Sequence, residues 1–232
     1  MNSIGRVYEA WRLGVQTQLG RSARLYPLLH RLRGAPRSGN LVGDETDLCI
    51  EAPSGSGNSF FVNGFRMINP DVRLAHHHHV AAQIERSAAR HIPTLVILRN
   101  PIDCVASRSQ GAPWLTGPVF SQWIRFFETA EALREAILSL SFESVTRDPE
   151  GAIERLNERF GCHFETHFPS PEQVFTQMDA AYAEAVTEPS RNPNRPDPAR
   201  AEARARARQA AESHPLAPSA VALYNRLRGS AQ

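Results

Sequence analysis

The sequence predicts an α/β fold in which helices flank a central parallel sheet. Short apolar runs rich in β-forming residues alternate with longer segments of helical periodicity, and this alternation is typical of strand–helix–strand crossover units. A glycine-rich turn joins the first core strand to the helix after it, as in folds of the P-loop nucleotide-binding type. We therefore expect a nucleotide-binding sheet with a helical arm before it and a helical part after it.

The composition indicates one globular domain outside the membrane. The 232 residues suffice for one sizeable core, and two full domains would be hard to accommodate. No apolar run reaches the roughly 20 residues that a membrane-spanning helix needs, and the charged N-terminal sequence lacks the apolar stretch of a secretory signal, so we expect a cytoplasmic protein. Cys49, Cys104 and Cys162 have the spacing of neither a disulfide framework nor a zinc site.

All 26 basic residues of the chain are arginines. Arginine binds phosphate through a planar fork of donors, whereas lysine offers a mobile point charge, so any phosphate site here has to work without lysine. The net charge is only +2, and arginines are interspersed with acids along the chain. We therefore do not expect a nucleic-acid partner.

Residues 1–43 are expected to form a basic helical arm and a linker, followed by the α/β domain over residues 44–232. Residues 2–33 contain two helical patterns of apolar residues among arginines, and residues 34–43 are rich in Gly, Pro and Ser. A basic amphipathic arm of this kind can pack on the core, or it can contact a membrane surface or a partner.

The expected elements of the domain follow in alternating order. The patterns predict strands at residues 46–52, 72–77, 94–98 and 138–142. They predict helices at residues 60–67, 81–90, 119–138, 149–160, 171–185, 198–213 and 218–228, with one more helix beginning at Pro101. The stretch 187–198 holds four prolines and is expected to be a loop.

The glycine-rich turn after Pro53 is the first candidate binding site. Its residues are Ser54, Gly55, Ser56, Gly57, Asn58, Ser59 and Phe60. Glycines let successive backbone N–H groups converge, the helix N-terminus adds positive potential, and Ser56 and Ser59 can add hydroxyl donors, so an anion would be stabilised there. The ATP-type motif GxxxxGK[ST] is absent, which argues against an ordinary P-loop ATPase or kinase. A plain turn between two elements is the other interpretation.

The second candidate site is the segment RNPIDCVAS. Arg99 lies at the carboxyl end of the third strand, where open α/β sheets place their ligands. Asn100 as the cap, Pro101 as the first helical residue and Asp103 as the acid of a capping box predict a helix start. The Arg99 fork and the Ser107 hydroxyl two turns later can converge on one phosphate. Alternatively, Arg99 pairs with Asp103 or another acid.

These segments resemble motifs of the PAPS-dependent sulfotransferase family. The turn is similar to the family's 5′-phosphosulfate loop, PKSGTT or PRSGNT followed by an aromatic residue, and RNPIDCVAS is similar to its 3′-phosphate signature R[ND]PxDxxxS. The segment SFESVTRDPEGAIERLNERFG also resembles, more weakly, the family's YEDLxxDPxxxxxxLxxFLG segment. The resemblance spans about residues 44–162. It implies that Arg99 and Ser107 hold a 3′-phosphate and that the glycine turn holds the phosphosulfate.

The chain departs from the family pattern at one basic position of the first motif and in its C-terminal part. Gly55 stands where the family has a basic residue before the SG pair, and no RKGxxG-type loop is found. Arg191 and Arg195, in the proline-rich loop, are candidates to replace that loop, although a solvated role is the alternative for both.

The run His76 to His79 supplies the candidate catalytic base. Imidazole, with an unperturbed pKa of about 6.5, suits proton abstraction near neutral pH. The resemblance to the family's KTHLP-like segment places the base at His77, with His76 and His79 as competitors and Ala75 in place of the lysine. Alternate strand residues face opposite sides, so at most two of the four can share a pocket, and the spacing shows no further ligands for a metal. The alternative is that these histidines have no catalytic role.

The resemblance implies a transferase that moves a sulfuryl group from PAPS to a hydroxyl or amine and leaves PAP, without a metal. The acceptor would be a small molecule, a lipid or a carbohydrate. Two other functions remain open. One is a P-loop kinase acting on a small molecule, and the other is a non-catalytic module that binds a 3′-phosphorylated nucleotide and has lost the chemistry together with the two family lysines.

Overall fold

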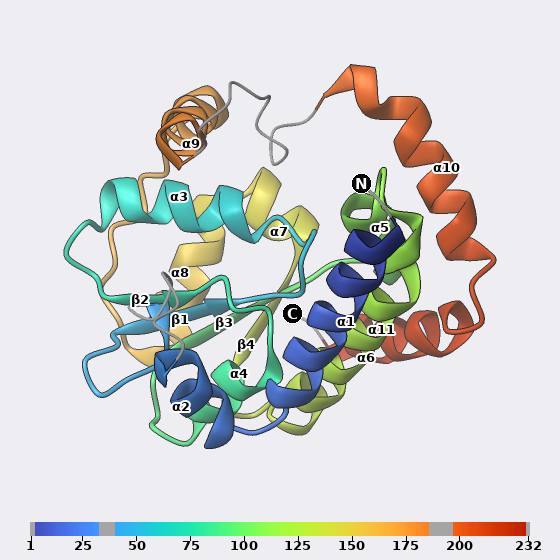
Figure 1. Ribbon diagram of the computed structural model, residues 1–232. Helices are drawn as coiled ribbons and strands as arrows, with labels where there is room; N and C mark the ends of the chain where they lie inside the picture. Colours follow the sequence, from blue (N-terminus) through green and yellow to red (C-terminus); the bar gives the residue numbers. More distant parts are fainter. Residues whose placement is uncertain (1–2, 33–39, 186–196, 231–232) are drawn as a thin grey trace.

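A four-stranded parallel sheet forms the centre of the protein. A computed structural model describes residues 3–32, 40–185 and 197–230 (Figure 1). The strands are β1 (Leu48–Glu51), β2 (Leu74–His76), β3 (Thr94–Leu98) and β4 (Leu138–Ser141), in the spatial order β2-β1-β3-β4 with every neighbouring pair parallel. The predicted fold class, a parallel sheet flanked by helices, is confirmed.

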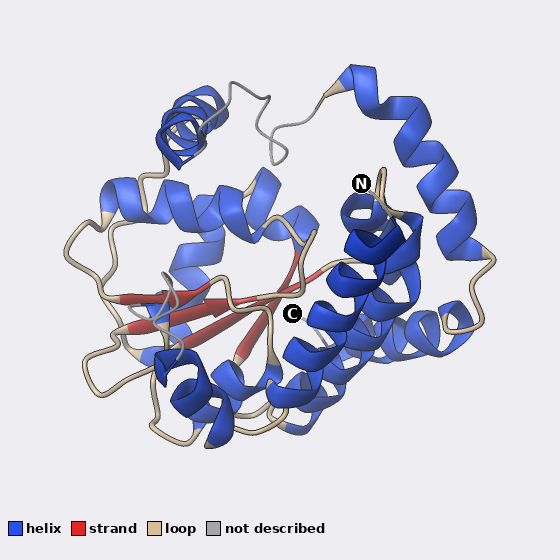
Figure 2. Cartoon of the chain, viewed as in Figure 1, coloured by secondary structure: helices blue, strands red, loops and turns tan. Residues whose placement is uncertain are grey.

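Helices cover both faces of this sheet (Figure 2). They are α1 (Ser3–Leu19), α2 (Leu25–Leu32), α3 (Asn58–Ile68), α4 (Ala81–Ala88), α5 (Pro101–Ser109), α6 (Thr116–Ala132), α7 (Phe142–Arg147), α8 (Pro149–Phe160), α9 (Pro171–Ala185), α10 (Ala201–Glu212) and α11 (Ala217–Ser230), with short 3-10 turns η2 (Pro113–Leu115) and η3 (Pro198–Arg200). None of these described helices is long and apolar enough to cross a bilayer.

The largest departures from the sequence-based expectations are at α6 and α7. Helix α6 ends at Ala132 instead of continuing to residue 138, and the six-residue helix α7 was not expected. Helix α7 is too short to show a period, and it begins directly after β4, where the Ser141 side chain accepts a hydrogen bond from the backbone N–H of Ser144 (3.0 Å). Most of the expected linker 34–43 and most of the loop 187–198, including Arg191 and Arg195, lie outside the described residues.

Strand β3 illustrates how the sheet separates two cores. Every residue of β1, β2 and β3 is buried, as expected for strands covered on both faces. Val96 and Leu98 of β3 contribute to a core shared with α1, α5, α6 and α11, whereas Leu95 and Ile97 contribute to a core shared with α3, α7, α8 and α9. This division follows from the two-residue period of a strand.

Polar contacts fasten the N-terminal arm to this domain. The Arg86 guanidinium of α4 donates hydrogen bonds to the carbonyls of Ala23 (3.0 Å) and Val42 (2.9 Å), and the Gln16 side chain donates to the carbonyl of His78 (3.1 Å). Leu13 packs in the same core as α6. The arm is therefore held against the domain on one side.

Trp123 packs in the core and also contacts the end of β3. Truncating its side chain therefore measures how much this packing stabilises the protein. Its ring is fully buried, and its Nε1 donates a hydrogen bond to the carbonyl of Arg99 (3.3 Å). We expect Trp123→Ala to lower the free energy of unfolding by about 3–5 kcal/mol, because the substitution leaves a large cavity. Met67→Ala, at a side chain that is 40% exposed, should change it by less than about 0.5 kcal/mol. Urea unfolding measures both, and equal effects would contradict this packing.

Candidate functional site

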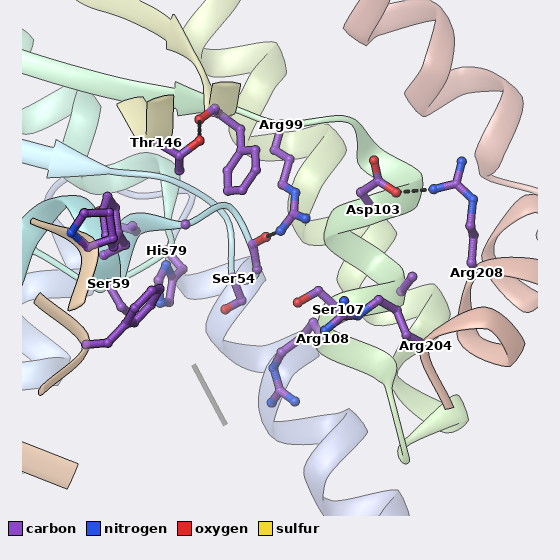
Figure 3. A pocket seen from close by; sticks show the side chains of 18 residues that line it. Ser54, Ser59, His79, Arg99, Asp103, Ser107, Arg108, Thr146, Arg204 and Arg208 are labelled. Atoms are coloured by element: carbon purple, nitrogen blue, oxygen red, sulfur yellow. Dashed lines mark hydrogen bonds and ion pairs between the residues drawn. The ribbon is translucent and has the colours of Figure 1, made fainter. Parts of the chain in front are cut away.

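A cavity of about 630 Å³ opens at the carboxyl edge of the sheet. The chain leaves β1 toward β2 on one side and leaves β3 toward β4 on the other, so the strand order reverses direction between β1 and β3. Such a switch point separates the loops that follow the two strands and leaves a crevice between them. The glycine turn after β1 and helix α5 after β3 line the cavity, together with residues of α7, α9 and α10 (Figure 3).

The cavity wall contains nearly all of the nucleotide-binding candidates. Lining residues from that set are Ser54, Gly55, Gly57, Asn58, Ser59, Phe60, Arg99 and Ser107. The exception is Ser56, which is buried with its hydroxyl 3.1 Å from the Cys104 sulfur of α5. Ser56 therefore fastens the turn to α5 instead of facing the cavity.

The two glycines of the turn occupy backbone conformations that other residues rarely adopt. Gly55 has φ 88° and Gly57 has φ 78°, both left-handed. A Cβ on Gly55 would lie 2.8 Å from the carbonyl oxygen of Cys104, and a Cβ on Gly57 would lie 2.6 Å from the Phe142 ring. No side chain caps the start of α3, so backbone N–H groups at this end are not satisfied by a capping group. An anion at the turn would meet these donors.

Cys104 lies beside the turn as a neutral packing partner. Burial raises the pKa of its thiol to about 11, and the nearby Arg99 charge opposes that rise only in part. The thiol is therefore protonated at neutral pH and is a poor nucleophile.

Arg99 reaches the cavity from the end of β3. Its guanidinium donates a hydrogen bond to the Gly55 carbonyl (2.5 Å) and lies 4.1 Å from the centre of the Phe142 ring. Arg99 forms an ion pair with neither Asp103 nor any other acid in the part of the chain that the structure describes. Its positive charge is therefore available to an anion in the cavity.

The start of helix α5 is capped by Asn100 as expected, but Asp103 does not have its expected role. The Asn100 side chain accepts a hydrogen bond from the backbone N–H of Ile102 (2.9 Å), and Pro101 is the first helical residue. The expected capping-box role of Asp103 is wrong, because its carboxylate forms an ion pair with Arg208 of α10 instead. Ser107 lies two turns into the helix, against the glycine turn. In Figure 3 the Arg99 and Ser107 side chains extend from α5 and its start toward the turn at Ser54.

The cavity is also lined by three arginines, Arg108, Arg204 and Arg208, which the sequence motifs did not indicate. Arg108 of α5 lies 3.7 Å from the Glu9 carboxylate, and Arg208 pairs with Asp103 and with Glu212 (3.0 Å). Arg204 makes no hydrogen bond or ion pair with a described residue. Arg204 and Arg208 are four residues apart and therefore share one face of α10. The alternating Ala-Arg pattern of α10 contained this spacing, but it could not show which face packs on α5.

A buried carboxylate holds the histidine run in its observed shape. Strand β2 ends at His76, after which His77 and His79 adopt φ 62° and φ 58°. Such values are uncommon in residues other than glycine and are retained only where the surroundings hold them. Glu51 is fully buried at the end of β1, and its two oxygens accept the backbone N–H groups of His78 and His79 (2.9 Å each). The two oxygens of one buried side chain hold consecutive backbone N–H groups, so Glu51 sets the path of this turn.

The histidines reach the cavity to different extents. His79 lines it, and its Nδ1 donates a hydrogen bond to the Ala52 carbonyl (2.6 Å). Because a carbonyl can only accept, the neutral ring of His79 carries its lone pair on Nε2. His77 lies behind Ser59, with its Nε2 3.1 Å from the Ser59 hydroxyl and its Nδ1 in contact with Nδ1 of the buried His76. The structure thus brings His79 to the cavity directly, and His77 through Ser59.

Known proteins were compared with the chain by sequence and by structure. No protein-family model and no curated protein matches the sequence. The solved structures that match include the mouse sulfotransferase SULT7A1 in complex with PAP, with 11% sequence identity and a TM-score of 0.43 over 78% of this chain and 90% of that chain. In the described residues, no group of three His, Cys, Asp or Glu side chains is placed to hold a metal ion.

Gly57→Ala tests the geometry of the turn. The new Cβ would require a left-handed backbone and would collide with the Phe142 ring that supports Arg99. We expect the free energy of unfolding to fall by about 1–3 kcal/mol. The matched control is Gly14→Ala in α1, where a Cβ meets nothing within 4 Å, and this change should raise stability by about 0.5–1 kcal/mol. Urea unfolding that gave Gly57→Ala wild-type stability would contradict the turn described here.

Proposed function

We propose that the protein is a sulfotransferase that moves a sulfuryl group from PAPS to a hydroxyl or amine of an acceptor. The observation that supports this proposal most strongly is the meeting of Arg99, Ser107 and the glycine turn at one cavity, with Arg99 unpaired by any described acid. The motifs that resemble the family's two phosphate-binding segments are 40 residues apart in sequence, yet both line this cavity.

The cavity offers two places for anionic groups. Arg99 and Ser107 would hold the 3′-phosphate, with Arg204 as a further donor in place of the family's missing C-terminal loop. Binding would move the Arg99 hydrogen bond from the neutral Gly55 carbonyl to a phosphate, which is the stronger acceptor. The glycine turn would hold the phosphosulfate with its backbone N–H groups and the Ser59 hydroxyl.

The transfer step requires groups that stabilise the charge on the leaving nucleotide and a base that accepts the proton of the acceptor. The acceptor oxygen attacks sulfur in line, the bond between sulfur and the bridging phosphate oxygen breaks, and negative charge develops on PAP. The backbone N–H groups of the glycine turn would stabilise this charge where the family uses lysine, because they are positioned before the reaction starts. The acceptor proton would pass to a histidine.

His79 is the base that this geometry favours. Its ring lines the cavity, and the bond from Nδ1 to the Ala52 carbonyl selects the neutral tautomer in which Nε2 carries no proton. His77, the first choice from the sequence, contacts the cavity through the Ser59 hydroxyl. His77 and His76 would therefore act as support for Ser59, while Glu51 positions the turn that carries His79.

Two observations bear on the other functions considered. Asp103 is the one carboxylate among the described lining residues, and it is paired with Arg208, so the cavity offers poor ligands for the Mg²⁺ that a kinase needs. The second alternative is a non-catalytic binding module, and it is consistent with Gly55 in place of the family's basic residue. Binding and transfer therefore need separate measurements.

Nucleotide selectivity tests the binding half of the proposal. Adenosine 3′,5′-bisphosphate should raise the melting temperature, whereas ATP with Mg²⁺ should not, because only the former carries a 3′-phosphate. Arg99→Ala should abolish the shift, and Arg204→Ala should weaken binding about tenfold. Arg206→Ala is the matched control, since Arg206 pairs with Glu202 on the exposed side of α10 and should leave binding unchanged. Equal shifts with both nucleotides, or none, would contradict the proposal.

Transfer of labelled sulfate from PAPS to a panel of phenols, lipids and glycans tests the chemistry. His79→Ala should lower kcat by about 10²–10⁴-fold and remove the acid limb of the pH–rate profile, with binding of adenosine 3′,5′-bisphosphate retained. His167→Ala, at a side chain that is 93% exposed, is the control and should be fully active. If His79→Ala keeps full activity and His77→Ala loses activity, the catalytic base is His77. Binding without transfer to any acceptor would favour the non-catalytic module.

A further inference from the structure

The exposed apolar side chains of the described chain are concentrated on its two N-terminal helices. Six large hydrophobic side chains are strongly exposed in the described residues, and only Met67 lies elsewhere, on α3. The other five are Val7 (69% exposed), Tyr8 (60%), Trp11 (61%), Leu25 (53%) and Leu28 (54%). We call these five residues the arm face. Exposed apolar side chains on adjacent segments of the chain, three on α1 and two on α2, favour an interaction site on the arm.

Helix α1 carries apolar side chains on its outward side as well as on the side that packs against the domain. Its buried side chains, Leu13 and Thr17, face the domain. Val7 and Trp11 are four residues apart and Tyr8 and Trp11 are three apart, so they share the outward side, where the Tyr8 and Trp11 rings lie 6.1 Å apart. A surface helix normally turns mainly polar residues outward, so the exposed Val7, Tyr8 and Trp11 favour contact with an apolar partner.

The same segment has a net positive charge, whereas the rest of the chain is net negative. Residues 1–43 contain seven arginines and one acid, a net charge of +6, whereas the remaining chain contains 19 arginines and 23 acids, a net charge of −4. The one acid, Glu9, does not reduce the charge of the outward side, since its carboxylate accepts a hydrogen bond from Trp114 (3.1 Å) and pairs with Arg108. Arg12 and Arg24 are exposed and form no ion pair with a described residue.

We propose that the arm face docks on an anionic lipid bilayer, with its aromatic and aliphatic side chains in the interfacial region and its arginines among the headgroups. Trp and Tyr favour this interface, and basic residues near an anionic surface each add attraction. A second copy of the chain is a poorer occupant, because two arms of charge +6 would repel each other. The bonds from Arg86 and Gln16 hold the arm against the domain, so the face does not need to fold on binding.

Sedimentation with vesicles tests the docking. The full chain should bind vesicles of phosphatidylcholine with phosphatidylglycerol and not vesicles of phosphatidylcholine alone, and added salt should weaken binding. Binding should shift Trp emission to shorter wavelength. Trp11→Phe should retain binding and lose most of that shift, because Trp123 is fully buried and Trp114 is engaged with Glu9.

Matched substitutions separate the apolar and the charged contributions. The double substitution Trp11→Ser with Leu28→Ser should weaken vesicle binding at least about tenfold, whereas Met67→Ser, at the exposed apolar residue outside the arm face, should not. Arg12→Gln and Arg24→Gln should each weaken it about fivefold. Arg134→Gln, at an exposed arginine paired with Glu135, is the charge control and should have no effect. All of these positions are exposed, so urea unfolding should be unchanged.

Three outcomes would overturn the docking proposal. The first is equal binding to neutral and anionic vesicles, and the second is no vesicle binding at all. The third is self-association in light scattering that Trp11→Ser abolishes, without vesicle binding, since this would assign the arm face to a second copy of the chain. Each outcome is independent of nucleotide binding at the cavity.

Discussion

The contact between the glycine turn and helix α5 is the constraint on which the cavity depends. Gly55 lies so close to Cys104 and Ser107 that a Cβ would not fit, Ser56 is fastened to Cys104, and Arg99 bonds the Gly55 carbonyl. These short-range contacts place the loop after β1 and the helix after β3 against each other. The parallel sheet supplies the edge, but this packing determines that donors from both segments surround one space.

A second constraint acts from inside the sheet. Glu51 is a fully buried acid at the end of a strand, and the backbone N–H groups of His78 and His79 satisfy its oxygens. Pairing of β1 with β2 in parallel, with Ile50 opposite His76, brings the carboxylate and these donors together. The resulting left-handed turn directs the His79 ring to the cavity, so one buried side chain links strand pairing to the position of the proposed base.

Local patterns predicted the strands, the fold class and the segments that line the cavity, because a strand period, a glycine turn and a helix cap are encoded by neighbouring residues. The features that the sequence did not predict depend on contacts between residues far apart in the chain. Asp103 pairs with Arg208 from a helix about 100 residues later, and Arg204 reaches the cavity from the same helix. The preference for His79 over His77 arises because the turn breaks the alternation that a strand would have imposed.

A crystal structure with adenosine 3′,5′-bisphosphate would show directly whether Arg99 and Ser107 hold one phosphate. We expect the 3′-phosphate to lie within hydrogen-bond distance of both the Arg99 guanidinium and the Ser107 hydroxyl, with the 5′-phosphate on the backbone N–H groups of the glycine turn. A complex in which Arg99 stays on the Gly55 carbonyl, Ser107 makes no phosphate contact and the nucleotide binds elsewhere would contradict it.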